Sequence, residues 1–172
     1  TNSDTQSVAC TEQENGIDGI PFSLVKTAKD GEEAGPQYAY VKTDDLADFV
    51  MAKQNSDVTS VEITENIPLK KGFVISEDMI ITARSGIGFY ANGFDAEDNV
   101  VTVMPNVNLT LNDVSISTDA TTKSGLHIYG GNVVANNLSI DNTNTVGGAP
   151  VIVNGGGLTL NGATDFKLGE NS

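Results

Sequence analysis

The side chains best suited to binding an ion are three acids that follow one another closely, Asp95, Glu97 and Asp98. Asn92 and Asn99 lie on either side of them. Carboxylate and amide oxygens are the hard ligands that calcium prefers. Their spacing does not match an EF-hand loop, and the alternative is an acidic loop in contact with water. We therefore predict no cofactor, with calcium as the one ion that these ligands would suit.

Aromatic and imidazole side chains are the candidates for contact with an organic ligand. Tyr90 and Phe94 lie in the same stretch as the acids, and we expect both to be exposed there. His127 alternates with aliphatic neighbours, so it points outward if they point inward, and Tyr129 shares its side. The alternative for His127 is a solvated ring on a β-face. The chain has no Trp, which weakens the case for sugar-binding platforms along the other strands.

No arrangement of side chains predicts catalysis. General acid–base chemistry needs ionisable groups that are brought close together. Asp113 precedes an aliphatic strand residue whereas Asp141 follows one, so these two acids are not expected to stack. The single His and the single Cys, Cys10, are far apart in sequence and favour neither a zinc site nor a catalytic triad. We therefore name no catalytic residue and lean toward a protein that is not an enzyme.

A repeat of about 25 residues in the C-terminal half must position these side chains. Its segments read VTVMPNVNLTLNDVSIS, LHIYGGNVVANNLSID and VIVNGGGLTLNGATDFKL. Within each segment apolar residues alternate with polar ones over short runs, which is typical of half-buried strands. Val103, Ile128 and Val153 recur at a constant spacing of 25. Such a period predicts that each unit stacks on the one before it, with Asn and Gly at the corners.

Three asparagines keep the same period after the second strand of each unit. Asn112, Asn136 and Asn161 are separated by 24 and 25 residues. Stacked asparagines can join successive coils by hydrogen bonds between their side-chain amides. The alternative is that Asn simply suits turns. We predict a structural ladder at these three positions.

The chain is predicted to form one domain with an irregular beginning. Residues 1–37 are assigned to an N-terminal segment or cap, and residues 38–172 to the stacked coils. Within the second range, residues 43–54 fit a short helix whose apolar face covers the first coil, because an open solenoid end is an unpaired edge. Nothing resembling a cap follows the last strand. We expect this edge to be covered by further repeats of a longer protein or by a second copy.

The repeat is interrupted in places where loops are expected. Residues 84–98 are predicted to project as a long loop. Residues 118–124 and 141–149 are shorter insertions at corresponding points of successive coils, so we expect them on the same side of the molecule.

The stretch from Thr43 to Ile116 resembles the start of a right-handed parallel β-helix of the pectin-lyase-like class. More narrowly, it is similar to repeat modules of secreted and cell-surface bacterial proteins. The resemblance rests on TDDLADFVMAKQNS, then SVEITENIPLKKGFVISEDMIITA, then coils of the LTLNDVSI kind. It implies an all-β solenoid of about five coils with a short N-terminal capping helix. It implies little about activity, because this fold hosts lyases, hydrolases, adhesins and phage spikes.

Two classes of function remain open. One is a non-enzymatic extracellular or cell-surface module, adhesin-like or a structural stalk, that binds a glycan or a surface protein. The other is a polysaccharide-active lyase or hydrolase, whose catalytic coils are missing or whose residues lie within 84–98. The net charge of −14 argues against nucleic acid as a partner. The sequence contains no apolar run of the ~20 residues that a membrane-spanning helix needs, so membrane insertion is not expected.

Overall fold

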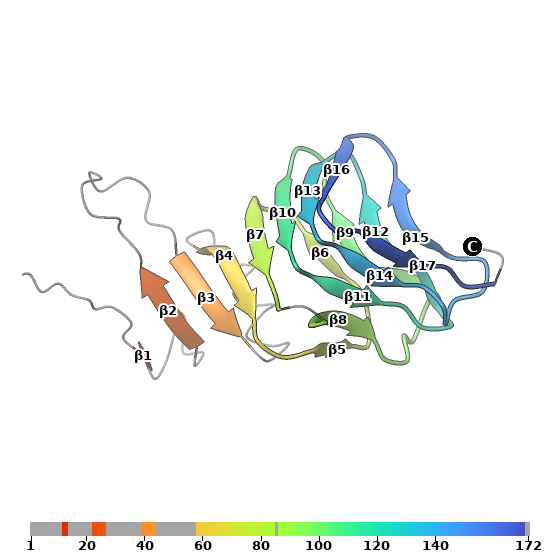
Figure 1. The fold of residues 1–172 in the computed structure, drawn as a ribbon, viewed down its shortest axis with the longest axis horizontal. Coiled ribbons are helices and arrows are strands. Elements are labelled where there is room, and N and C mark those ends of the chain that lie inside the picture. Colours follow the sequence, from red (N-terminus) through yellow and green to blue (C-terminus); the bar gives the residue numbers. More distant parts are fainter. Residues whose placement is uncertain (1–11, 14–21, 27–38, 44–57, 85, 171–172) are drawn as a thin grey trace, which may run out of the picture.

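The computed structural model describes residues 12–13, 22–26, 39–43, 58–84 and 86–170, which form an all-β structure (Figure 1). Three parallel sheets make up its main part, and the chain visits them in turn, so that each circuit lays one strand on each sheet. The result is a parallel β-solenoid of about four turns. The predicted fold class is confirmed, with about one turn fewer than the sequence suggested.

Each sheet collects strands from successive turns, and its neighbours are bonded in parallel register. The first sheet contains β4 (Val58–Ile63), β7 (Met79–Thr82), β10 (Asn108–Asn112), β13 (Asn132–Asn136) and β16 (Gly157–Asn161). The second contains β5 (Ile67–Leu69), β8 (Gly88–Ala91), β11 (Ser115–Ser117), β14 (Ser139–Asp141) and β17 (Asp165–Lys167). The third contains β6 (Phe73–Ile75), β9 (Asp98–Val103), β12 (Thr122–Ile128) and β15 (Ala149–Val153).

The first sheet continues beyond β4 toward the N-terminus. There β3 (Ala39–Thr43) runs parallel to β4, and β2 (Phe22–Lys26) and β1 (Glu12–Gln13) follow in antiparallel order. The predicted capping helix over residues 43–54 lies outside the described residues, except for Thr43, which is the last residue of β3. In the part of the chain that the structure describes, no helix has the length and apolarity needed to cross a membrane.

The core consists of aliphatic columns that run along the solenoid. Val103, Ile128 and Val153 are register partners on β9, β12 and β15, which confirms the predicted alignment of the repeats. Val103 and Ile128 are fully buried. Side chains that alternate along each strand meet their equivalents ~4.8 Å away on the next turn. Burial of each Val or Ile side chain contributes about 1.5–3 kcal/mol, so the columns hold the turns together.

The corner between the first and second sheets repeats a left-handed residue in three successive turns. Asp113, Asn137 and Gly162 have φ angles of 57°, 56° and 73°. Asp, Asn and Gly adopt this conformation more readily than other residue types. The Asn137 Nδ2 donates to Asp113 Oδ1 over 2.8 Å, and the Ala163 N–H donates to Asn137 Oδ1 over 2.9 Å. The corner residues therefore also fasten each turn to the next.

The predicted projecting loop over residues 84–98 is wrong for its central part. Residues 88–91 form β8, which pairs with β5 on one side and with β11 on the other. The turn is longer because five residues, 83–87, connect β7 to β8, whereas two residues, 113–114, make the same connection one turn later. The extra length is thus absorbed in a corner of the solenoid, and most of the stretch belongs to its body.

Candidate ligand pocket

The connections from the second to the third sheet lie next to one another in three successive turns. They comprise residues 92–97, 118–121 and 142–148. Residues from all three connections line one cavity, so they share one side of the solenoid. This confirms the prediction that the insertions around 118–124 and 141–149 lie on the same side.

Asp119 fastens the first of these loops to the second. Its Oδ2 accepts hydrogen bonds from the N–H groups of Gly93 and Phe94, both over 2.8 Å, and its Oδ1 accepts one from the Thr122 hydroxyl over 2.7 Å. Partial burial by itself raises the pKa of Asp119. The hydrogen bonds outweigh this effect and hold the pKa below its usual value of 3.8, because each of them favours the ionised carboxylate.

A buried polar network fastens the third loop to the second. The Thr118 hydroxyl donates to Asn142 Oδ1 over 2.8 Å, and the Thr145 hydroxyl lies 2.7 Å from that of Thr118 and 2.9 Å from the Asp119 carbonyl oxygen. The Asn142 Nδ2 donates to the Gly148 carbonyl over 3.2 Å. Polar groups that are buried and fully bonded restrict a structure to one arrangement. The loop walls of the cavity are therefore held in place before any ligand arrives.

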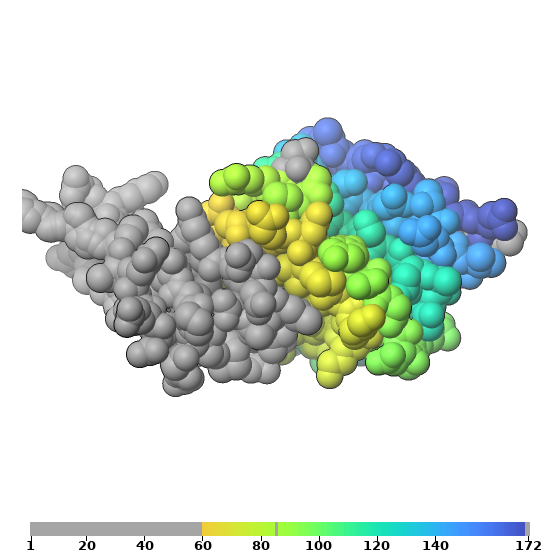
Figure 2. Space-filling model, turned by 90° about the horizontal axis from the view of Figure 1, so that it is seen from below, coloured from red at the N-terminus to blue at the C-terminus, as the bar shows by residue number. Residues whose placement is uncertain are grey.

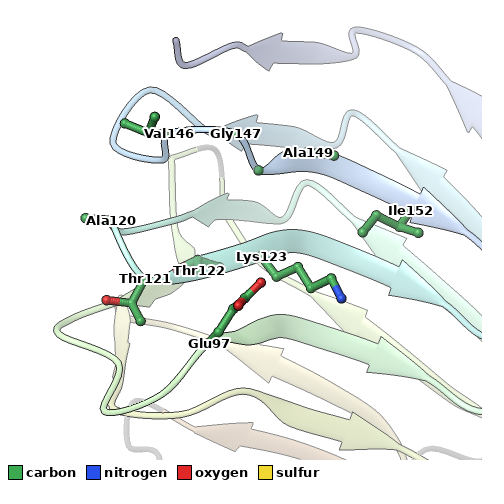
Figure 3. Close-up of a pocket in the computed structure, with 10 residues that line it drawn as sticks. Glu97, Ala120, Thr121, Thr122, Lys123, Val146, Gly147, Ala149 and Ile152 are labelled. Atoms are coloured by element: carbon green, nitrogen blue, oxygen red, sulfur yellow. The ribbon is translucent and has the colours of Figure 1, made fainter. Parts of the chain in front are cut away.

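The cavity has a volume of about 460 Å³, which is within the usual range for ligand pockets. It opens over the third sheet and is bounded by the loop that carries Val146 (Figure 3). Glu97 and Lys123 come from successive turns, and the Lys123 side chain runs along the sheet toward Ile152 (Figure 3). The lining residues are Glu97, Ala120, Thr121, Thr122, Lys123, Val146, Gly147, Gly148, Ala149 and Ile152.

An irregularity in strand pairing places Lys123 in this cavity. Between Thr122 and Ser124 the register of β12 against β9 shifts, because Thr122 pairs with Asp98 and Ser124 with Asn99. Lys123 is the extra residue of this β-bulge, and bulges redirect side chains.

A side chain at Gly148 would collide with Thr145 and lie 3.0 Å from the Lys123 carbonyl oxygen, so the close approach of the two turns requires glycine there.

The groups in the cavity can bind a ligand that carries hydroxyl groups. The Lys123 ammonium donates hydrogen bonds, the Glu97 carboxylate accepts them, and the Thr121 hydroxyl does both. Val146 and Ile152 add apolar surface for the carbon skeleton. The single carboxylate and the single ammonium offset each other, so the cavity itself has little net charge.

His127 is held between neighbouring turns. Its Nδ1 lies 3.1 Å from Asn99 Nδ2, and its Nε2 lies 3.0 Å from Asn154 Nδ2. The Ser124 hydroxyl donates to Asn99 Oδ1, so Asn99 turns its amide hydrogens toward His127. A neutral imidazole has one accepting and one donating nitrogen. Nδ1 therefore accepts from Asn99, and the ring as a whole is held by one side-chain amide from the preceding turn and one from the following turn.

The four residues predicted to contact a ligand do not form one site. Phe94 is 5% exposed, so the expectation that it is an exposed aromatic is wrong: Asp119 draws its backbone inward and the ring joins the core. Tyr90 lies on the second sheet beside a separate polar hollow of about 330 Å³. His127 lies on β12 of the third sheet, and Tyr129 comes just after the end of this strand. Their rings are in edge-to-face contact, with ring centres 5.8 Å apart.

The acids proposed as calcium ligands do not form a group. Asp98 accepts hydrogen bonds from the N–H groups of Gly72 and Asn99, over 3.1 Å and 2.7 Å. Glu97 lines the cavity, and Asp95 is exposed. Among the described residues, no three His, Cys, Asp or Glu side chains are grouped so that they would hold a metal ion.

The three ladder asparagines are joined by hydrogen bonds along the first sheet. The Asn136 Nδ2 donates to Asn112 Oδ1 over 2.8 Å, and the Asn161 Nδ2 donates to Asn136 Oδ1 over 3.0 Å. The Asn112 Nδ2 in turn lies 3.3 Å from the Thr82 hydroxyl. The side-chain amides of these asparagines therefore join neighbouring turns by hydrogen bonds.

Sequence reasoning missed Lys123 and Asp119. Lys123 is the only Lys or Arg among residues 99–166, and it lies within the predicted insertion 118–124, which was a usable signal. Asp119 comes about one repeat after Gly93 and Phe94, which are its hydrogen-bond donors. An alignment of residues 84–98 with the later coils would therefore have predicted these contacts.

No protein-family model matches the chain, and neither a curated protein nor a solved structure is significantly similar to it. We therefore infer the function from the geometry of the solenoid and its pocket.

Proposed function

We propose that this chain is a non-enzymatic module of the pectin-lyase-like β-helix class that acts at the surface of a bacterial cell or outside it. In this proposal the solenoid is an adhesin-like rod, and the cavity at Glu97 and Lys123 binds a glycan. The observation that carries the proposal is the cavity itself, because its walls come from three turns that are fastened together by hydrogen bonds. Fixed walls reduce the entropy that binding costs.

The charge of the chain selects among glycans. With a net charge of −14, the protein repels polyanions at long range, so acidic polysaccharides are disfavoured and uncharged ones are favoured. The hydrogen-bonding groups of Lys123, Glu97 and Thr121 match the hydroxyl groups of a neutral sugar. The cavity volume of about 460 Å³ leaves room for a short stretch of saccharide.

The non-enzymatic part of the proposal is supported by the use of the polar side chains. Both nitrogens of His127 are bound to neighbouring turns, and the Asp98 and Asp119 carboxylates accept backbone N–H groups. Residues occupied in this way stabilise the rod and are not free to move protons.

The second candidate is a polysaccharide-active enzyme, and one observation favours it. Glu97 and Lys123 line the same cavity, and a carboxylate with an ammonium group is the minimum set for proton transfer to and from a sugar. The two candidates differ in their products, because an adhesin releases its glycan unchanged.

The test is a glycan array, followed by titration calorimetry with the best neutral glycan and analysis of new reducing ends. We expect binding without cleavage. Lys123→Met should abolish binding, whereas Lys71→Met, which removes the same charge from an exposed site outside the cavity, should not. Calcium and a chelator are compared in parallel, and neither should change binding. Cleavage that is lost in Glu97→Gln would favour the enzyme, and binding that survives Lys123→Met would refute the pocket.

The proposed location has its own test. In the natural host, surface proteolysis and cell fractionation should find the protein outside the cytoplasm. Recovery in the cytoplasmic fraction alone would contradict an adhesin.

A further inference from the structure

The outer face of the third sheet carries a row of side chains that begins at the cavity. Ile152 lines the cavity, and its register partner one turn earlier is His127. Tyr129 comes two residues after His127, and the two rings are in edge-to-face contact. Side chains two residues apart along an extended chain project from the same face and are separated by ~7 Å. The ring of Tyr129 therefore stands close to the edge of the cavity.

This part of the outer face is apolar and exposed. Tyr129 is 53% exposed, and β12, which it follows, has a paired strand on both sides, so the exposure comes from its place on the outer face. Met104 follows the register partner of Ile128, so it lies beside Tyr129 one turn earlier, and it is 37% exposed. The turns follow one another as adjacent bands, from yellow to blue (Figure 2). Apolar side chains grouped on a surface in this way mark an interaction site.

The ring of Tyr129 packs against a neighbour that is itself held in place. His127 lies 3.1 Å from the side-chain amide of Asn99 and 3.0 Å from that of Asn154. The Ser124 hydroxyl donates to Asn99 Oδ1, which fixes this amide in turn. Tyrosine offers a large contact area with few rotatable bonds, and a supported ring loses little entropy when a ligand binds.

The chemistry of this surface suits an uncharged sugar. One face of a sugar ring consists of C–H groups, and the electron-rich face of an aromatic ring attracts such hydrogens. The Tyr129 hydroxyl can donate and accept hydrogen bonds at the rim of the ring. None of the outward residues around it is Asp, Glu, Lys or Arg; they are Val74, Thr102, Met104, His127 and Ile152. A charged ligand would find no ionic partner there.

We propose, on the basis of the glycan binding proposed above, that the cavity and Tyr129 are two parts of one binding surface. The cavity holds one end of a neutral glycan, and the ring of Tyr129 holds the part of the chain that extends beyond it. The Lys123 side chain runs along the sheet toward Ile152, so the cavity extends in the direction of His127 (Figure 3). The site therefore selects for the length of the glycan as well as for its lack of charge.

The test is titration calorimetry with fragments of increasing length from the neutral glycan that ranks highest on an array. The wild type should bind a fragment long enough to reach Tyr129 at least about tenfold more tightly than the shortest fragment that it binds. Tyr129→Ala should lose most of this gain and should bind the shortest fragment as the wild type does. Tyr129→Phe keeps the ring and should keep most of the gain. Tyr90→Ala removes the same side chain from the second sheet and should behave like the wild type.

The wild type provides a second readout that needs no loss of the ring. The NMR signals of the Tyr129 ring protons, assigned by comparison with Tyr129→Phe, should shift with the longer fragment and stay nearly unchanged with the shortest one. Melting temperatures check that each variant is folded.

Several results would overturn the Tyr129 subsite and leave glycan binding in the cavity intact. They are a wild type that binds all fragments equally tightly, ring signals that do not respond to the longer fragment, and a Tyr129→Ala variant that keeps the gain. A Tyr129→Ala variant that weakens all fragments equally would show a purely structural role, and a Tyr90→Ala variant that also loses the gain would show that the effect is not local. A wild type that binds no neutral glycan overturns both proposals.

Discussion

Removing the central amide of the asparagine ladder should destabilise the solenoid measurably. Asn136→Ala eliminates two hydrogen bonds, one of 2.8 Å to Asn112 and one of 3.0 Å from Asn161. A hydrogen bond within a protein contributes about 0.5–1.5 kcal/mol net. Asn112 and Asn136 are half-buried and Asn161 is exposed, so water replaces part of the loss. We expect the free energy of unfolding to fall by about 1–2 kcal/mol.

The assay is urea denaturation followed by circular dichroism, with Asn132→Ala as the matched control. Asn132 lies on the same strand, β13, and is exposed, and no ladder bond involves its side chain. Its replacement should change the free energy of unfolding by less than about 0.5 kcal/mol. Combining Asn112→Ala with Asn136→Ala should cost less than the sum of the two, because both remove the same bond. Equal effects of Asn136→Ala and Asn132→Ala would refute the role of the ladder.

Three further predictions follow from the core and the corners. Ile128→Asp buries an unpaired charge and should leave the chain unfolded, which circular dichroism detects, whereas Thr110→Asp on the outer face should fold. Gly148→Ala should lower stability by about 1–3 kcal/mol in urea denaturation, because its new methyl group meets Thr145, whereas Gly157→Ala has room. Asp119→Asn should reduce acid sensitivity: the carboxylate's lowered pKa contributes stability that is complete above the unfolded value and is lost as pH falls through the lower folded value. Melting temperatures from pH 7 down to pH 3 should therefore drop less steeply in this variant than in the wild type.

The alignment of the later coils was predictable because the pairing is strictly periodic. A spacing of 25 between Val103, Ile128 and Val153 fixes which residues stack, and alternation then fixes which of them face inward. The same period predicts the asparagine ladder. The two shorter loops followed from their equal places in successive repeats.

The prediction was wrong where the period changes. Because five residues form the corner before β8, the register of residues 84–98 cannot be read from the later repeats, and the sequence pattern predicts a loop where the structure has β8. A place within the predicted loop 84–98 implies that Phe94 is exposed, yet Asp119 from the next turn draws it into the core. Contacts between residues one turn apart decide burial here, and composition does not carry that information.

The pocket could not be predicted, because it belongs to three turns at once. Lys123 enters it through a bulge in β12, and Glu97 comes from the preceding connection. A single irregular pairing determines where the Lys123 side chain points. Such a shift has no signature in a pattern of alternating residues.

The most direct test of the proposed function compares wild-type protein and Lys123→Met in calorimetric titration with the neutral glycan that ranks highest on an array. The proposed function predicts saturable binding to the wild type, no detectable binding to the variant at equal melting temperature, and an intact glycan after the titration. A wild-type protein that binds no neutral glycan, or a variant that binds as tightly as the wild type, would contradict it.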